Sequence, residues 1–175
     1  MAFIFSLGDK TPQISADAFI APNATIVGDV IIESQANIWY GVVIRGDAGQ
    51  IRVGARTSVQ DNTVLHVNDK HDTLIGADVT IGHAAVLEGC VIGDGVLIGM
   101  NATVLDGAQV GAGALVAAGA LVRENQTIPD GMIAAGVPAK VRGAVSAELA
   151  ARLVEAPQKY QTYMQLHADA IEALA

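Results

Sequence analysis

Residues 75–122 read IGADVT IGHAAV LEGCV IGDGVL IGMNAT VLDGAQ VGAGAL VAAGAL V, and an aliphatic residue opens almost every block of six. A period of six does not match the 3.6-residue period of an amphipathic helix. It fits short strands that each point a large and a small side chain inward before a turn. This stretch therefore predicts a β-solenoid, in which one hexad cannot bury its apolar face alone and stacked hexads form a continuous core.

The same pattern extends over most of the chain. Four residues after each lead, the residue is Ala, Val or Thr in sixteen of eighteen hexads. The leads are Ile14, Ile20, Ile26, Ile32, Ile38, Ile44, Val53, Val59, Leu65, Ile75, Ile81, Leu87, Ile92, Ile98, Val104, Val110, Val116 and Val122. The pattern resembles that of hexapeptide-repeat proteins, which implies an all-β fold: a left-handed parallel β-helix with a three-sided cross-section. Eighteen residues per coil then give about six coils.

Three steps break the period, and a different pattern follows it. The steps from Ile44 to Val53 and from Leu65 to Ile75 are long, which predicts loops near residues 47–51 and 68–73, and the step from Leu87 to Ile92 lacks one residue. We predict a β-helix domain over 1–142 and an α-helical appendage over 143–175 that packs on it. Ser146 is a candidate N-cap, and Pro157 is expected to divide the appendage into two helical pieces.

Composition excludes several classes of protein. Apolar residues make up 51% and aromatic residues only 4%, which suits a narrow repetitive core. The net charge of −8 argues against nucleic acid and anionic membranes as partners. Cys90 is the single cysteine, so no intrachain disulfide forms. With neither a signal peptide nor a transmembrane stretch recognised, we expect a cytoplasmic protein, or one of an organelle matrix if a transit segment was removed.

Three hexads per coil place polar residues in columns. Arg45, His66 and Glu88 each follow a lead on the same face, so they stack with a spacing of about 4.8 Å. His66 and Glu88 could therefore share one metal ion. His83 lies at the preceding corner, roughly 16 Å along the extended chain from Glu88, so it reaches the same ion only from a second chain. A closed three-fold ring would contain three equal sites.

At these residues the sequence resembles the gamma-class carbonic anhydrase-like family. The matching motifs, in order, are Arg45-Gly46-Asp47, Gln60-Asp61-Asn62, Leu65-His66-Val67 and Ile81-Gly82-His83. The resemblance extends to about Arg142. It implies a homotrimer with three metal sites at subunit interfaces, each with three histidine ligands, and hydration of carbon dioxide to bicarbonate.

The resemblance also implies roles for single residues. Two ligand histidines match His66 and His83, and the third ligand position is Glu88. Gln60, with Asp61 beside it, would orient the metal-bound water, and Arg45 with Asp47 would form interface ion pairs. Two histidines and a glutamate are a known zinc set, so zinc is expected, with iron(II) or cobalt(II) as alternatives. A carboxylate ligand makes bound water less acidic, and we therefore expect weak or absent hydratase activity.

Other candidate residues have plainer explanations. His71 could substitute as a ligand or relay protons, although a solvated loop histidine is favoured. His167 is expected to be exposed, and Cys90 to be a small structural residue. Tyr160 and Tyr163 lie where members of the family often place a tyrosine towards the site.

Two alternative functions stay open. One is a coenzyme A-dependent acyltransferase, a common activity of this β-helix, which needs a histidine base beside a groove between subunits. The other is a non-catalytic trimeric binding or assembly protein in which the metal site has decayed. The substitution of the third ligand by Glu88 is the main support for this second alternative.

Overall fold

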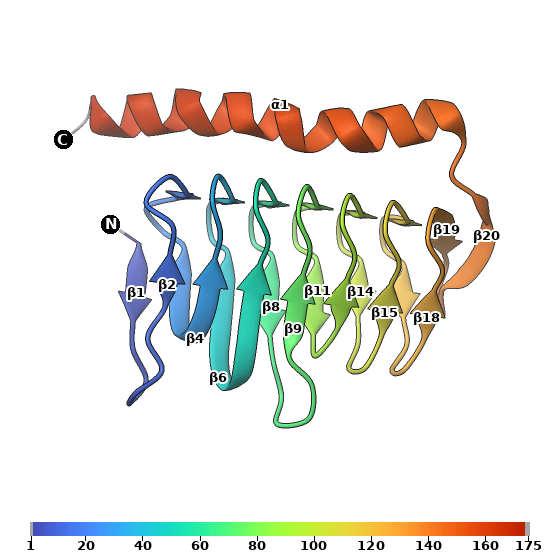
Figure 1. Cartoon of the computed structure of the whole chain (residues 1–175), viewed down its shortest axis with the longest axis horizontal. Coiled ribbons are helices and arrows are strands. Elements are labelled where there is room, and N and C mark those ends of the chain that lie inside the picture. The colour runs from blue at the N-terminus through green and yellow to red at the C-terminus, as the bar shows by residue number, and fades with distance from the viewer. Residues whose placement is uncertain (1, 174–175) are drawn as a thin grey trace.

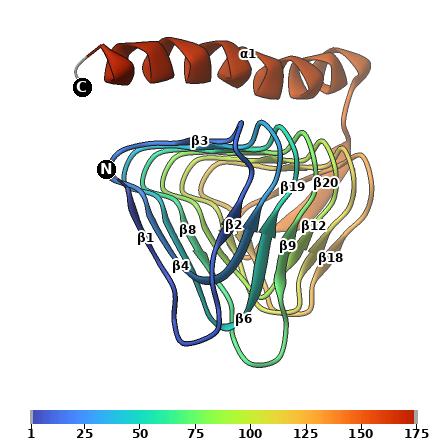
Figure 2. The same cartoon turned by 60° about the vertical axis from the view of Figure 1, so that its left-hand side comes forward.

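The computed structural model describes residues 2–173 and shows a parallel β-solenoid of three sides with one long helix beside it (Figures 1 and 2). Residues 1, 174 and 175, at the ends of the two predicted ranges, lie outside the described part. Helix α1 (Ala147–Glu172) runs along the length of the solenoid, opposite to the direction in which the coils advance. No helix in the described part is long and apolar enough to span a bilayer.

The side of the solenoid under α1 is an eight-stranded sheet, here called the helix face. All its contacts between neighbouring strands are parallel except the last pair, β19 with β20. Its strands are β3 (Phe19–Ile20), β5 (Asn37–Ile38), β7 (Ser58–Val59), β10 (Thr80–Ile81), β13 (Leu97–Ile98), β16 (Leu115–Val116), β19 (Met132–Ala135) and β20 (Lys140–Ala144).

The other two sides are joined into one twelve-stranded sheet, because two long strands pass through the corner between them. These strands are β4 (Thr25–Ile32) and β6 (Val43–Val53). The second face carries β1 (Phe3–Phe5), β8 (Val64–His66), β11 (Val86–Glu88), β14 (Thr103–Val104) and β17 (Leu121–Val122). The third face carries β2 (Gln13–Ile14), β9 (Thr73–Ile75), β12 (Val91–Ile92), β15 (Gln109–Val110) and β18 (Thr127–Ile128).

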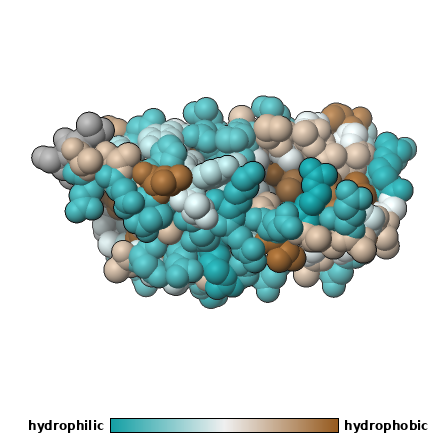
Figure 3. Space-filling view, turned by 90° about the horizontal axis from the view of Figure 1, so that it is seen from above, coloured by the Kyte–Doolittle hydropathy of each residue, from teal (hydrophilic) through white to brown (hydrophobic). Residues whose placement is uncertain are grey.

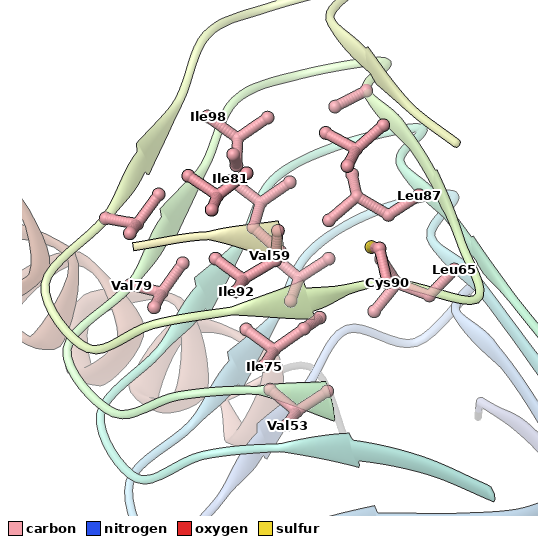
Figure 4. Close-up of a cluster of buried hydrophobic side chains, with 14 of the residues drawn as sticks. Val53, Val59, Leu65, Ile75, Val79, Ile81, Leu87, Cys90, Ile92 and Ile98 are labelled. Carbon is pink, nitrogen blue, oxygen red and sulfur yellow. The ribbon is translucent and has the colours of Figure 1, made fainter. Parts of the chain in front are cut away.

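The predicted inward positions form the core. From Ile26 to Val122 every lead is at most 3% exposed, and most of the small residues between them are similarly buried. Ala48 is an exception, and Cys90 occupies the interior in place of the exposed Val91. Figure 4 shows leads from all three faces, such as Val59, Leu87 and Ile92, meeting in the interior. Parallel pairing keeps them in register, as between Ile81 and Ile98. The hexapeptide-repeat β-helix is therefore confirmed.

Two details of the repeat differ from the prediction. The solenoid has about seven turns and not six, because the inward positions continue after Val122 through the buried Ile128 and Ala134. Residues 47–51 form no separate loop, since β6 runs through them, but the register with β4 shifts there: Gly28 pairs with Gly46 and Val30 with Ile51. The second long step does produce a loop, which protrudes between β8 and β9 (Figure 1).

The prediction of two helical pieces was also wrong, because α1 is one continuous helix with Pro157 inside it. Pro157 and Leu153 are the buried residues of α1. Packing of this stretch on the helix face offsets the hydrogen bond that proline removes. The N-terminal prediction holds, since the Ser146 hydroxyl accepts a hydrogen bond from the Leu149 amide at 3.2 Å.

Candidate metal centre

The second face brings Arg45, His66 and Glu88 together in one column. His66 pairs with Arg45 on one side and with Glu88 on the other, in the parallel register of β6, β8 and β11. The predicted stacking of these three residues is therefore correct. Counting hexads is enough to predict it. The extra residues lie in 47–51 and 68–73, outside the paired positions of this face, so its register stays intact.

His66 lies between two carboxylates. Its Nε2 is 3.2 Å from Asp47 Oδ1, and its Nδ1 is 3.4 Å from Glu88 Oε1. When the imidazole is neutral it carries a single N–H, so at most one of these contacts is then a hydrogen bond and the other turns two lone pairs towards each other. Such an arrangement accepts a cation. The donors present on the second face therefore fit a divalent metal ion.

Asp47 connects this group to Arg45, with which it forms an ion pair. Burial opposes ionisation of Asp47, but the hydrogen bond and charge of Arg45, together with His66, outweigh it and lower the pKa of this carboxyl. Asp47 is thus an anion beside His66 over the ordinary pH range. Its position supports a role for Asp47 in orienting the His66 ring. Glu88 is then the carboxylate on the strand next to His66.

His83 lies elsewhere, at the corner that follows β10. Its Nδ1 is 2.8 Å from Asp61 Oδ2, one coil below. The side chain is 45% exposed, and its Nε2 makes no hydrogen bond with the described residues. An oriented imidazole with its second nitrogen turned outward is a typical metal ligand.

The two histidines therefore belong to separate parts of one chain. Among the described residues, no group of three His, Cys, Asp or Glu side chains could hold a metal within a single chain. Of the three predicted ligands, His66 and Glu88 lie together on the second face and His83 lies at the other corner. The two parts can meet only when one chain's corner lies against the second face of another.

Thr73 fixes the spacing of the two coils that carry His66 and Glu88, a role that was not expected from the sequence. Its buried hydroxyl donates to the His66 carbonyl at 2.5 Å and accepts from the Gly89 amide at 2.8 Å. Gly89 has φ +58°, and a Cβ there would lie 2.2 Å from Asp106 Oδ1. The sequence did contain a sign of this role, because Thr73 stands at the end of the long step, at the inward position two residues before the lead Ile75.

The loop between β8 and β9 places His71 away from His66. His71 Nδ1 lies 2.9 Å from Asp106 Oδ1, and Asn68 donates to the same oxygen at 2.6 Å. Burial opposes ionisation of Asp106, but the hydrogen bonds from Asn68 and His71 prevail and lower its pKa. His71 is thus anchored to a carboxylate at the corner that opens the third face, and the structure gives it no contact with His66 or Glu88.

Gln60, His83 and Tyr160 line one hollow between the helix face and α1. Burial raises the pKa of Tyr160, and the nearby charge of Asp61 raises it further. Tyr163 stacks edge-on against Tyr160, with ring centroids 5.8 Å apart. Tyr160 therefore lies beside a predicted ligand, as the resemblance suggested.

The remaining candidates are structural. Cys90 is fully buried, and burial raises the pKa of its thiol to about 12, so it is not an activated nucleophile. His167 is exposed as expected but is not free. Its Nδ1 lies 2.8 Å from the Tyr40 hydroxyl and its ring packs edge-on against Trp39, which fastens the end of α1 to the solenoid.

Comparison with known proteins gives consistent matches. The family model described as "Bacterial transferase hexapeptide (six repeats)" matches residues 11–46, 72–104 and 89–124. Residues 47–71, which contain His66 and parts of both long steps, fall outside those matches.

Three individual proteins illustrate the similarity. Gamma carbonic anhydrase 2, mitochondrial, of Arabidopsis thaliana is 42% identical over 95% of this chain, which spans 62% of that relative. Protein YrdA of Escherichia coli K12 is 40% identical, over 92% of this chain and 91% of YrdA. The crystal structure of a hexapeptide transferase family protein from Anaplasma phagocytophilum is 38% identical, with a TM-score of 0.90, over 93% of this chain and 96% of that one.

Proposed function

Because this chain belongs to the gamma carbonic anhydrase-like family of hexapeptide-repeat proteins, we propose that it is a metal-dependent carbonic anhydrase-like enzyme with its sites between subunits. The observation that carries the proposal is the position of His66. It stacks directly beside Glu88 on one face, while His83 presents a free nitrogen at another corner. A homotrimer would bring these parts together three times.

Each residue of the site has a separate task. His66, Glu88 and the second chain's copy of His83 would hold the ion, which we expect to be zinc, with iron(II) or cobalt(II) as alternatives. Asp61 orients the His83 ring, and Asp47, paired with Arg45, holds the ring of His66. Gln60 would direct the reacting water, since its amide lies in the same hollow as His83.

The chemistry that a bound divalent cation supplies is the acidification of a water molecule, which then hydrates carbon dioxide near neutral pH. The carboxylate of Glu88 donates more negative charge than an imidazole would, so it opposes this acidification. We therefore expect slow hydration, and Glu88→His to accelerate it. We expect a cytoplasmic location.

Elemental analysis of protein purified without chelators tests the metal site. We expect about one metal ion per chain, which is lost in His66→Ala and His83→Ala and retained in His71→Ala, a matched histidine outside the proposed set. Light scattering gives the number of chains per particle. A metal-free protein even after reconstitution would refute the proposal and favour the non-catalytic trimer.

Mixed subunits test whether the site lies between chains. When His66→Ala and His83→Ala chains are refolded together in equal amounts, about one quarter of the sites should combine an intact His66 from one chain with an intact His83 from the next. A site within one chain would recover no metal in this mixture. Stopped-flow hydration of carbon dioxide by wild type and Glu88→His then measures the activity.

An acyltransferase is the second candidate, favoured by the hexapeptide transferase similarity. It would use coenzyme A, and calorimetric titration with coenzyme A distinguishes it from the metal-dependent enzyme. Tight coenzyme A binding that survives removal of metal would reverse the ranking of the two functions.

A further inference from the structure

A hollow of about 530 Å³ lies between α1 and the helix face, beside His83. Leu97 and Leu115 form one wall, Met100 stands at the corner, and Tyr160 closes the hollow from the helix. Viewed from the side of α1, apolar surface shows between the hydrophilic side chains (Figure 3). Pockets that bind small organic molecules have volumes of about 300–1,000 Å³, and this hollow lies within that range.

The sequence itself produces this hollow. Along the helix face, the position after each lead carries Trp39 and Gln60 in the lower coils but Gly82, Gly99 and Ala117 in the upper ones. Because the upper coils carry no large side chain at this position, space is left there between the helix face and α1. A Cβ on Gly82 would lie 2.7 Å from the Met100 amide nitrogen, so the chain approaches itself too closely there for a side chain.

The hollow has polar as well as apolar lining residues. The polar side chains are those of Gln60, Thr80, His83 and Tyr160, whereas the other lining residues are aliphatic residues, glycine and Met100. The Thr80 hydroxyl is buried and has no hydrogen-bond partner among the described residues. A buried hydroxyl without a partner leaves hydrogen-bonding capacity for a ligand.

We propose that this hollow binds the hydrocarbon part of a short aliphatic monocarboxylate. Its carboxylate lies at the end near His83 and Gln60, and its chain extends over Ala117 against Leu97 and Leu115. The lining residues include no lysine or arginine, so the negative head group is balanced by the cation held with His83. Because it needs this cation, the binding of the head group rests on the proposed function. The inference extends the site to ligands larger than carbon dioxide.

Calorimetric titration of the metal-loaded protein with acetate, butanoate and hexanoate tests the proposal. Burial of each methylene should raise the affinity about fourfold, so affinity should increase steeply along the series. Equal affinities for the three carboxylates overturn the proposal. A side chain of a second copy that filled the hollow would also give equal affinities, and it would overturn the proposal in the same way. An increase in affinity with chain length supports it.

Two variants assign the effect to this hollow. Ala117→Leu fills its floor and should abolish the gain from acetate to hexanoate while leaving acetate binding and metal content unchanged. Ala112→Leu makes the same change at an exposed residue outside the hollow and should leave the whole series unchanged. If hexanoate keeps its advantage in Ala117→Leu, the hydrocarbon chain binds elsewhere and the proposal is wrong.

A neutral series separates this inference from the proposed function. Butan-1-ol and hexan-1-ol carry no charge, so their binding to metal-free protein depends on the hollow alone. If the protein takes up no metal, the carbonic anhydrase proposal fails, but a gain from butan-1-ol to hexan-1-ol that Ala117→Leu removes still supports the hollow as the hydrocarbon site. Equal affinities of the two alcohols for the metal-free protein overturn it.

Discussion

The solenoid has an irregular middle stretch and a regular C-terminal stretch, and they differ in the residue that comes directly after each lead. In the irregular coils, residues 43–91, that position carries a polar side chain in four of seven hexads, namely Arg45, Gln60, His66 and Glu88, and glycine in the other three. In the regular coils, residues 92–134, it carries mostly glycine, alanine or another apolar residue, with Arg123 as the polar exception. All three breaks of the six-residue period lie in the irregular coils. The predicted site residues are therefore concentrated where the repeat is interrupted.

The two stretches also hold their coils together differently. Regular coils rely mainly on stacked aliphatic leads and backbone ladders such as β13 with β16, although Asp130 also accepts a hydrogen bond from the Ala112 amide at 3.0 Å. Irregular coils add hydrogen bonds from side chains, as when Thr73 bridges His66 and Gly89, or when Asp72 accepts from the Gln50 amide at 2.9 Å. Departures from the six-residue period in these coils are therefore accompanied by polar contacts between side chain and backbone.

The largest expected effect comes from the core of the regular coils. Ile98→Ala removes a fully buried lead and should lower the free energy of unfolding by about 2–5 kcal/mol, through lost burial and the cavity left behind. Urea unfolding measures this. Leu74→Ala, at a residue 37% exposed, is the control and should cost less than about 1 kcal/mol. Equal losses in the two variants would contradict a core made of stacked leads.

Next in size is a change that acts on the irregular coils alone. Thr73→Val keeps the shape of the side chain but removes the hydroxyl that joins His66 to Gly89. It should lower the free energy of unfolding by about 1–3 kcal/mol and weaken metal binding about tenfold. Thr73→Ser keeps the hydroxyl and should retain most of the metal affinity. Metal affinity unchanged in Thr73→Val would show that Thr73 has no positioning role.

A smaller effect is expected at the loop after β8 and depends on pH. The pKa of Asp106 is lowered in the folded protein, so its ionised form stabilises the fold above the ordinary value of 3.8, and this contribution disappears as pH falls through the folded pKa. Asp106→Asn should therefore be less stable than wild type at pH 7. The difference should shrink in urea unfolding as the pH falls below about 4. A difference that persists undiminished in acid would assign it to packing.

The smallest effect is expected for an exposed ion pair in the same irregular coils. Arg56 lies 2.6 Å from Asp78, and the two side chains are 46% and 44% exposed. Arg56→Gln should cost about 0.2–1 kcal/mol, less still at high salt. Urea unfolding measures this loss of stability. A loss above that range would show that an exposed ion pair stabilises these coils as strongly as the buried Thr73 hydroxyl does. The distinction between the two kinds of polar contact would then be wrong.

The sequence alone determined the repeat, the inward positions and the column of Arg45, His66 and Glu88. It could do so because a solenoid repeats one local rule: in each coil the same positions point inward, and a residue's place follows from counting. Counting also separated His83 from His66. It failed at the ends of the pattern, where Ile128 and Ala134 add a turn although their neighbours no longer resemble a hexad.

Only the tertiary structure decided the features that depend on contacts between distant segments. Pro157 lies inside a continuous helix because the solenoid packs against it, and residues 47–51 stay in a strand because β4 pairs with the chain at both ends of this stretch, at Gly46 and at Ile51. The bridge through Thr73 and the hollow between α1 and the helix face likewise depend on segments far apart in the chain. Local propensity and periodicity describe each segment alone, whereas these features arise from the energy of one segment packing on another.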